Sequence, residues 1–202
     1  ISPEVSEEKK AELIEKVRRL SSRCEAVVIS GGLARSMLPS YYADVLSAVP
    51  EKVKKVVDTS GERLFEALKC GADLIKPNLE ELKSTLNISV DSKEDALEGC
   101  HKLLKLGAKR VLLSLGKDGA IITDGNKNYY CKSINVAMNS TIGAGDGMVA
   151  AATFALAKGG SLEDILRCGV AGGTAAVTTP DDITFRREKY EEILDGLEVK
   201  EI

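Results

Sequence analysis

The chain has 202 residues, of which 44% are hydrophobic, 29% charged and 4% aromatic, and its formal net charge is −3. This length is typical of one domain with a hydrophobic core, and the slightly acidic balance excludes a protein that grips nucleic acid or an anionic membrane by bulk charge. The low aromatic content, with no Trp, also argues against a stacking platform for single-stranded nucleic acid.

The first half of the chain alternates helical and strand patterns. Apolar residues recur at helical spacing over residues 6–20, and Ala26-Val27-Val28-Ile29 predicts a buried strand. The pattern continues with helix 41–48, strand 55–58, helix 61–69, strand 73–76, helices 79–86 and 93–106, and strand 110–115. This alternation predicts a mainly parallel sheet with helices on both faces.

The pattern changes after Gly119. Three short strands are predicted at 120–123, 128–131 and 133–136, followed by Ala-rich helices at 144–158 and 162–177 and a charged helix at 186–197. No linker, repeat or low-complexity stretch interrupts the chain, so we expect a single α/β domain over residues 1–202.

The five cysteines are odd in number and none forms a C-x-x-C pair. Reduced thiols in a cytoplasmic protein are therefore expected, rather than a disulfide framework or a zinc site. No apolar run approaches the roughly 20 residues of a membrane span. Together with the charge balance, the lack of such a run predicts neither nucleic acid nor membrane as a partner.

Polar and glycine-rich loops follow the predicted strands. They are Ser30-Gly31-Gly32, Asp58-Thr59-Ser60-Gly61, Pro77-Asn78 and the loop 114–119. Ligands of open parallel sheets bind beyond the carboxyl ends of the strands, so these loops predict a small-molecule site.

The most informative segment is Asn139-Ser140-Thr141-Ile142-Gly143-Ala144-Gly145-Asp146-Gly147-Met148, which precedes the first Ala-rich helix. Its small residues permit a tight turn with outward-facing amides, and a helix start adds partial positive charge. Gly143, Ala144 and Gly145 thus predict an anion hole for a phosphoryl group. Asp146 at its mouth could orient a substrate hydroxyl and accept its proton.

Two other interpretations of this segment are possible. Asp146 could simply cap the helix. Gly145-x-Gly147-x-x-Ala150 also matches a degenerate dinucleotide fingerprint, but it comes late in the chain, and no strand that ends in an acidic residue follows at the required distance.

Two further segments are candidates for nucleotide contacts. The loop Ser114-Leu115-Gly116-Lys117-Asp118-Gly119-Ala120 follows the strongest strand and could clasp phosphates or ribose, or be a simple hairpin turn. In Lys76-Pro77-Asn78-Leu79-Glu80-Glu81-Leu82, Asn78 and Glu81 have capping-box spacing; alternatively they face phosphates and a hydrated Mg²⁺.

Other chemistries find little support in the residues. The chain has no Walker loop and no Gly-x-Ser-x-Gly elbow, and its single histidine, His101, falls inside a predicted helix. We therefore expect His101 to be structural and do not expect hydrolase chemistry.

Together, the segments around Asp146, Gly116 and Asn78 resemble the signatures of the ribokinase/PfkB carbohydrate kinases, in order and spacing along nearly the whole chain. The resemblance implies the three-layer αβα, Rossmann-like ribokinase fold. Asp58-Thr59-Ser60-Gly61 and the Asn-Ser-Thr before Gly143 look most like the 1-phosphofructokinase branch.

The resemblance also implies roles for individual residues. Asp146 would be the catalytic base beside an anion hole of Gly143, Ala144 and Gly145. ATP contacts would come from Asn78, Ser114, Leu115, Gly116, Lys117, Asp118, Gly119 and Gly145. Ser30 and Asp146 would contact the substrate, and Glu81 would hold Mg²⁺ through water.

The implied reaction is the ATP-dependent phosphorylation of a sugar phosphate, first of all fructose 1-phosphate to fructose 1,6-bisphosphate. Tagatose 6-phosphate, fructose 6-phosphate or a nucleoside are alternative acceptors within the family, and a homodimer is possible. A nucleotide-binding module without catalysis is the alternative from a different class.

The sequence departs from the family pattern in several places. Gly147 replaces a small polar residue or alanine and is expected to loosen the helix start, and Gly172 and Gly173 stand where many relatives have larger residues. Gly32-Leu33-Ala34-Arg35-Ser36 replaces the common Ser-Leu-Pro-Pro-Gly. The opening phrase from Ile1 resembles one about a third of the way through such kinases, so the lid and first strands would be absent, and this chain alone is expected to lack normal turnover.

Overall fold

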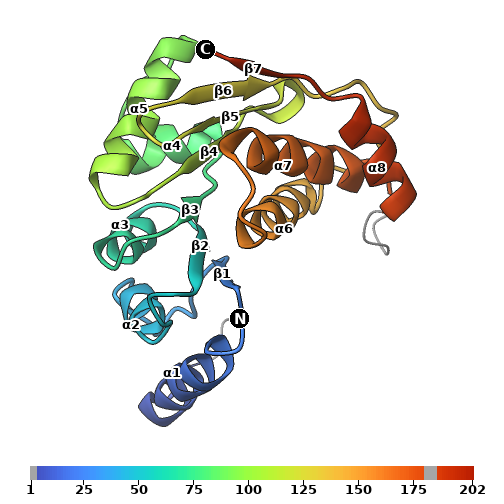
Figure 1. The fold of residues 1–202 in the computed structure, drawn as a ribbon. Helices are drawn as coiled ribbons and strands as arrows, with labels where there is room; N and C mark the ends of the chain where they lie inside the picture. The colour runs from blue at the N-terminus through green and yellow to red at the C-terminus, as the bar shows by residue number, and fades with distance from the viewer. Residues whose placement is uncertain (1–3, 180–185) are drawn as a thin grey trace. The chain divides into compact units, whose positions relative to one another are not determined.

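The computed structural model describes residues 4–179 and 186–202 (Figure 1). Contacts within the chain divide it into two compact units, Ile1–Arg110 and Val111–Ile202. The single-domain organisation expected from the sequence stays a prediction. Of the opening phrase, residues 1–3 lie outside the described residues.

The first unit is built of helices and parallel strands. Its helices are α1 (Glu7–Ser21), α2 (Tyr41–Ser47), α3 (Glu62–Lys69), α4 (Leu79–Leu86) and α5 (Lys93–Lys105), and its strands are β1 (Ala26–Ser30), β2 (Lys54–Asp58) and β3 (Leu74–Ile75). Strands β1 and β2 pair in parallel with Ser30 opposite Asp58, and β2 pairs in parallel with β3. The loops that follow β1 and β2 therefore emerge at the same edge.

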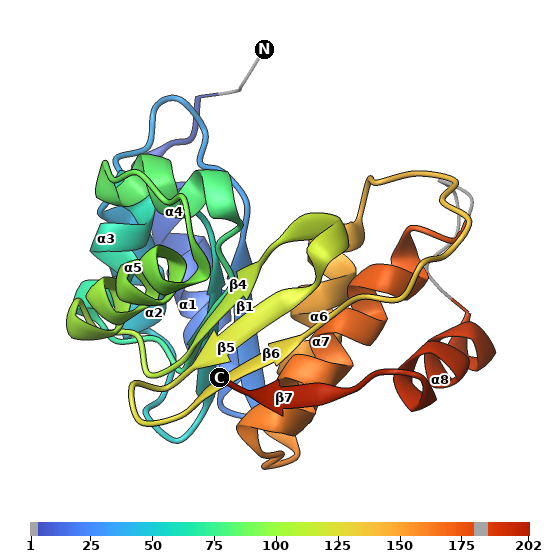
Figure 2. The ribbon, with the colours of Figure 1, turned by 90° about the horizontal axis from the view of Figure 1, so that it is seen from above.

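Sequence pattern explains these elements. In β2, Val56 and Val57 are fully buried, as a strand with both faces covered requires. In α3, the buried residues Leu64, Ala67 and Leu68 recur at helical spacing, and the helix packs on α2 (Figure 2). The parallel, helix-covered arrangement predicted for the first half is confirmed.

The second unit is antiparallel. Its strands are β4 (Val111–Ser114), β5 (Ala120–Thr123), β6 (Asn128–Cys131) and β7 (Val199–Glu201); its helices are the 3₁₀ turn η1 (Gly116–Asp118), α6 (Ala144–Ala157), α7 (Leu162–Ala176) and α8 (Arg187–Asp195). Each strand pairs with the next in an antiparallel ladder. Helices α6 and α7 lie side by side, and α7 also contacts β5, β6 and α8 (Figures 1 and 2).

The expected strand at 133–136 is wrong, because this segment is irregular. Extending the pairing of β6 with β5 by two residues would place Ser133 opposite Asp118, which belongs to η1. Extending the pairing of β6 with β7 would place it opposite Leu197, which follows α8. Both flanking chains have already left the sheet, so residues 133–136 have no strand to pair with. The edge position goes instead to β7, which the sequence reading did not predict.

Helices α6 and α7 approach closely through glycines. A Cβ on Gly147 would lie 2.7 Å from the carbonyl oxygen of Gly172, and one on Gly172 would lie 2.4 Å from the carbonyl oxygen of Gly147. Gly147 was expected to loosen the start of α6. The structure instead gives it a packing role, because the backbones of α6 and α7 touch at Gly147 and any side chain there would push the two helices apart. Gly173 faces Ala144 and Met148 in the same interface.

Candidate functional site

The start of α6 is an open helix N-terminus. Gly143, the N-cap, has φ +80°, a left-handed conformation that favours glycine, and no side chain caps the helix. The first helical bond runs from the Gly147 N–H to the Gly143 carbonyl at 2.8 Å. Among the described residues, the N–H groups of Gly145 and Asp146 have no hydrogen-bond partner. Free amides and the helix dipole together suit an anion.

Asp146, the third residue of α6, is exposed, and no described residue forms a hydrogen bond or ion pair with its carboxylate. Carboxylates at the same position of α4, α5 and α7 (Glu81, Asp95 and Asp164) each close a capping box with the N-cap residue. Those bonds hold the pKa of Asp95 and of Asp164 below the ordinary value. Asp146 makes no such bond, so the capping interpretation finds no support in the structure.

The loop before α6 is fixed by Asn139. Its N–H donates to the Val177 carbonyl at 2.8 Å and its side-chain amide donates to the Thr178 carbonyl at 2.7 Å, both at the end of α7. Ser140 then accepts a bond from the Ile142 N–H at 3.1 Å. Sequence reasoning missed this role of Asn139, because its partners lie far along the chain and no local pattern points to them.

The loop of Ser114, Leu115, Gly116, Lys117, Asp118 and Gly119 forms a tight hairpin connection between β4 and β5. Gly116 and Gly119 have φ +61° and +95°, and a Cβ on Gly119 would lie 2.0 Å from the Cys131 carbonyl oxygen. Tyr130 and Ser133 donate hydroxyl bonds to the carbonyls of Asp118 and Lys117. The hairpin turn is therefore present, and the nucleotide contact stays a prediction.

Asn78 and Glu81 form a capping box at the start of α4. The Asn78 side-chain oxygen accepts from the Glu81 N–H at 2.8 Å, and the Glu81 carboxylate accepts from the Asn78 N–H at 2.8 Å. The capping interpretation is confirmed, but the capping box leaves one oxygen of the Glu81 carboxylate unused. Glu81 Oε1 carries no bond from a described residue, so its carboxylate fits the water-mediated Mg²⁺ contact that this ion prefers. In the described part of the chain, no three acidic, His or Cys side chains cluster as a metal cage.

Ser30, the remaining predicted substrate contact, is exposed at the end of β1. The carbonyl of Gly31 after it accepts bonds from the Tyr42 hydroxyl at 2.7 Å and the Thr59 hydroxyl at 3.0 Å. Arg63 Nε in turn donates to Thr59 Oγ1 at 3.0 Å. This polar network was not predicted, because it joins three segments that are separate in the sequence.

A buried ion pair joins the ends of β2 and the β3 region. Lys76 Nζ lies 3.3 Å from Asp58 Oδ1, and their side chains are only 6% and 15% exposed. Two buried opposite charges at the carboxyl edge of parallel strands neutralise one another and leave little net field there.

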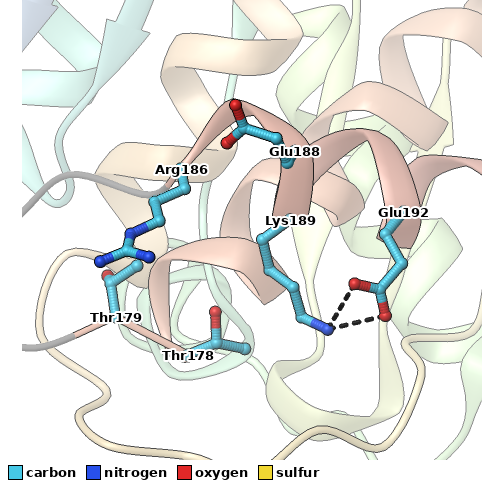
Figure 3. A pocket seen from close by; sticks show the side chains of 6 residues that line it. All are labelled: Thr178, Thr179, Arg186, Glu188, Lys189 and Glu192. Carbon is cyan, nitrogen blue, oxygen red and sulfur yellow. Dashed lines mark hydrogen bonds and ion pairs between the residues drawn. The ribbon is translucent and has the colours of Figure 1, made fainter.

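Two features fall outside the predicted site. His101 in α5 is half-buried, and its Nε2 has no hydrogen-bond partner among the described residues. A pocket of about 590 Å³ is lined by Thr178, Thr179, Arg186, Glu188, Lys189 and Glu192 (Figure 3). Figure 3 shows Lys189 directed toward Glu192 on the same helix, with bonds of 2.7 and 2.8 Å. None of the predicted site residues lines this pocket.

The structure thus brings the predicted residues together in local groups. Asn78 and Glu81 share one helix start, the six loop residues share one hairpin, and Gly143, Ala144, Gly145 and Asp146 share the first turn of α6. Within the second unit, no hydrogen bond or ion pair between described residues joins the hairpin to the first turn of α6. None of the described helices has the length and apolar character that a bilayer crossing needs.

Known proteins resemble this chain in sequence. The 1-phosphofructokinase of Borreliella burgdorferi is 34% identical over 176 residues, which cover 86% of this chain and 57% of that protein. The ATP-dependent 6-phosphofructokinase isozyme 2 of Escherichia coli is 36% identical over 175 residues, which cover 85% of this chain and 56% of that protein. The chain therefore spans little more than half the length of these relatives.

Solved structures resemble it in fold. Phosphofructokinase-2 from Escherichia coli in complex with potassium superposes with a TM-score of 0.88 at 32% identity, covering 95% of this chain and 63% of that one. The same enzyme in complex with fructose-6-phosphate gives a TM-score of 0.83. The α/β kinase fold implied by the sequence is confirmed. The model of the pfkB family carbohydrate kinases matches residues 1–189, and this chain belongs to that family.

Proposed function

We propose that the chain carries the nucleotide-binding and catalytic part of a kinase that transfers the terminal phosphoryl group of ATP to a hydroxyl of a sugar phosphate. The observation that carries the proposal is the start of α6, where two amides and an exposed carboxylate stand together and have no partner within residues 4–179 and 186–202. Family membership and the phosphofructokinase relatives support the same reaction class.

In this mechanism Asp146 orients the acceptor hydroxyl and takes its proton. The hydroxyl oxygen forms a bond to the terminal phosphorus while the bond from that phosphorus to the bridging oxygen breaks, and ADP leaves. In the anion hole proposed at Gly143, Ala144 and Gly145, the Gly145 N–H has no partner among the described residues and donates to the phosphoryl oxygens as charge develops on them, whereas the Ala144 N–H already donates to the Thr141 carbonyl at 3.4 Å. Because these donors are fixed by the helix, they need little reorganisation during the reaction.

The rest of the nucleotide would be held by the other predicted residues. The loop 114–119 and Asn78 contact its phosphates and ribose, and Glu81 holds Mg²⁺ through a water molecule on its free oxygen. When bound, Mg²⁺ supplies positive charge that neutralises the phosphates. We also place the reaction in the cytoplasm, in keeping with the cysteine content.

The decisive experiment replaces the carboxylate. We expect Asp146→Asn to lower the rate of phosphoryl transfer by about 10²–10⁴-fold, since this is the usual size of general-base effects, while ATP affinity changes little. The matched control is Asp164→Asn, which changes the same residue type at the same position of α7, where the carboxylate only caps. A rate for Asp146→Asn equal to that of the control would remove the mechanism.

The acceptor is proposed to be fructose 1-phosphate. Fructose 6-phosphate is the second candidate, because the Escherichia coli relative at 36% identity is named for that reaction. A panel of fructose 1-phosphate, fructose 6-phosphate, tagatose 6-phosphate and a nucleoside, with MgATP and a coupled ADP assay, ranks them by kcat/KM. Nucleotide binding without transfer to any acceptor would favour a non-catalytic module instead.

A further inference from the structure

We propose that Asn139 is a positioning residue for the anion hole. Its side-chain amide ties the loop before α6 to the end of α7, and this tie keeps the first turn of α6, with its unpaired N–H groups, in place for a phosphate. The inference rests on the proposed function and adds a residue to its site. All the groups involved belong to the second unit.

Asn139 makes two bonds to successive carbonyls at the end of α7. Its N–H donates to the Val177 carbonyl at 2.8 Å, and its side-chain Nδ2 donates to the Thr178 carbonyl at 2.7 Å. Val177 is the C-cap of α7, and carbonyls at a helix end have no partner within their own helix. Because one bond comes from the backbone and the other from the side chain, they fix both the position and the orientation of Asn139.

The end of α7 offers a firm anchor for this residue. The Thr178 hydroxyl donates to the Ala175 carbonyl at 2.7 Å, and the Thr179 hydroxyl donates to the Ala176 carbonyl at 2.8 Å. Together with the two bonds from Asn139, every carbonyl from Ala175 to Thr178 accepts a hydrogen bond. A helix end whose carbonyls are satisfied in this way resists fraying.

A short loop with bonds of its own joins this anchor to α6. The Ile142 N–H donates to Ser140 Oγ at 3.1 Å, and the Ala144 N–H donates to the Thr141 carbonyl at 3.4 Å. A displacement of Asn139 is therefore passed on to the start of α6, because the loop between them has little slack.

The chain on the other side of the anion hole rests on the same end of α7. A Cβ on Gly173 would lie 3.1 Å from the Ala144 carbonyl oxygen, and one on Gly172 would lie 2.4 Å from the Gly147 carbonyl oxygen. One helix end thus supports the chain before and after the unpaired amides. The support after them is backbone packing, whereas the support before them includes one replaceable side chain, that of Asn139.

This arrangement lets Asn139 act on phosphate affinity without touching the phosphate. Donors that are already fixed need no ordering when a ligand binds, so more of the binding free energy is retained. When the side-chain tie is lost, the ligand must order the loop as it binds. An amide suits this position because it donates to a carbonyl, and an ionised carboxylate of the same shape could only oppose one acceptor with another.

Titration of the 202-residue chain with a non-hydrolysable ATP analogue and Mg²⁺ tests the proposal without any need for turnover. Amide NMR follows the Gly145 and Asp146 N–H signals, which should shift in the wild type, and calorimetry gives Kd. We expect Asn139→Ala, which keeps the backbone bond to Val177, to weaken affinity about three- to tenfold, the usual scale of one lost hydrogen bond. Asn139→Asp should lose at least as much, because it has no donor.

The matched control is Asn126→Ala, which removes the same side chain from an exposed turn of the same unit, where only the Asn126 backbone N–H is bonded. Thermal melts separate positioning from simple helix capping. A lower melting temperature for Asn139→Ala with the affinity of the control overturns the proposal, and so does wild-type affinity in Asn139→Asp. Wild-type signals of Gly145 and Asp146 that do not respond would instead remove the anion hole, and with it both the proposed function and this inference.

Discussion

Four carboxylates occupy the third position of an α-helix, and among the described residues only one of the four has no partner. Glu81, Asp95 and Asp164 accept the N-cap amide of their own helix, whereas Asp146 does not. A carboxylate that stabilises its helix is bound to it, and one available for proton transfer must be accessible to a substrate. This difference between Asp146 and the other three carboxylates supports the chemical role proposed for Asp146.

This difference predicts unequal stability effects. We expect Asp164→Ala to lower the free energy of unfolding by about 1 kcal/mol, because it removes two bonds to the N-cap, while Asp146→Ala costs only a few tenths through the helix dipole. Urea denaturation of both variants measures the two costs. Equal losses would mean that Asp146 does cap α6.

A second prediction concerns the pH dependence of stability at Asp73. Burial alone raises the pKa of this carboxyl, but bonds from the Lys55 N–H at 2.9 Å and the Lys109 ammonium at 3.0 Å outweigh burial and hold the pKa below its ordinary value of 3.8. Because the pKa is lower in the folded state than in the unfolded state, the ionised carboxylate stabilises the protein at pH values above the unfolded-state pKa. This stabilisation is lost as the pH falls through the folded-state pKa.

The Asp73→Asn variant isolates this contribution. The wild type should be more stable than the variant at pH 7, and the difference should shrink below about pH 4, as the carboxylate becomes protonated. Thermal melts of both proteins between pH 3 and pH 7 measure it. A difference that stays constant over this range would contradict the assigned cause.

At the residue scale, sequence predicted best where the chemistry is local. Asp146 and the glycines before it lie within a few positions of one another, so a turn and a helix start could be inferred from their order. Asn139 and Arg63 could not be assigned in this way. Their partners, Thr178 and Thr59, become neighbours only through helix and strand packing, and no spacing rule encodes that.

Among the elements, the pair α6 and α7 is the one that positions the predicted anion hole. Their backbones touch at Gly147 and Gly172, one residue after Asp146. Small residues allow this approach, and the contact fixes how far the first turn of α6 stands from α7. The geometry of the helix start therefore depends on a residue that lies far from it in sequence.

Substitution in α7 tests this dependence. In Gly172→Ala the new Cβ would lie 2.4 Å from the Gly147 carbonyl oxygen and 2.6 Å from the Ala151 Cβ, so the helices must separate. We expect a loss of about 1–3 kcal/mol in stability and a lower rate of transfer. Gly169→Ala is the control, because its nearest atom is the flexible Leu112 side chain at 3.1 Å. Similar melting temperatures for both variants would contradict this.

Helices were predicted correctly from the sequence where the residues at their N-termini form a clear capping pattern. Ser161 and Asp164, or Asn78 and Glu81, mark a helix start by residue type and spacing, and α7 and α4 begin there. It failed at the sheet edge, where Ser133 to Val136 have strand character but no partner, while Val199 has one. Strand formation depends on pairing across the chain, so local pattern alone does not decide it.

At the scale of the whole molecule, strand β1 lies at an edge of the described sheet. Among the described residues it pairs only with β2, and Val28 on it is 41% exposed. An edge strand with apolar side chains presents unpaired amides and carbonyls to other chains. In the 202-residue chain this edge is therefore expected to favour self-association, while the homodimer stays a prediction.

Self-association is therefore expected to depend on this edge. The wild type should show concentration-dependent mass in sedimentation velocity, and Val28→Lys should reduce it, because a lysine on an edge strand disfavours pairing. Leu38→Lys serves as a control, since it removes a more exposed apolar side chain that lies off the strand. Equal reduction by both variants would assign the association to general surface hydrophobicity.

The uncapped start of α6 has a consequence for the stability and abundance of the protein in a cell. Donors that no described residue satisfies leave the ligand-free molecule less stable, and a bound phosphate compound raises stability with the logarithm of its concentration. Degradation acts on the briefly unfolded fraction. If the chain binds a nucleotide at this helix start, as proposed, the amount of the protein should follow the supply of that nucleotide, falling in starved cells and recovering when energy returns.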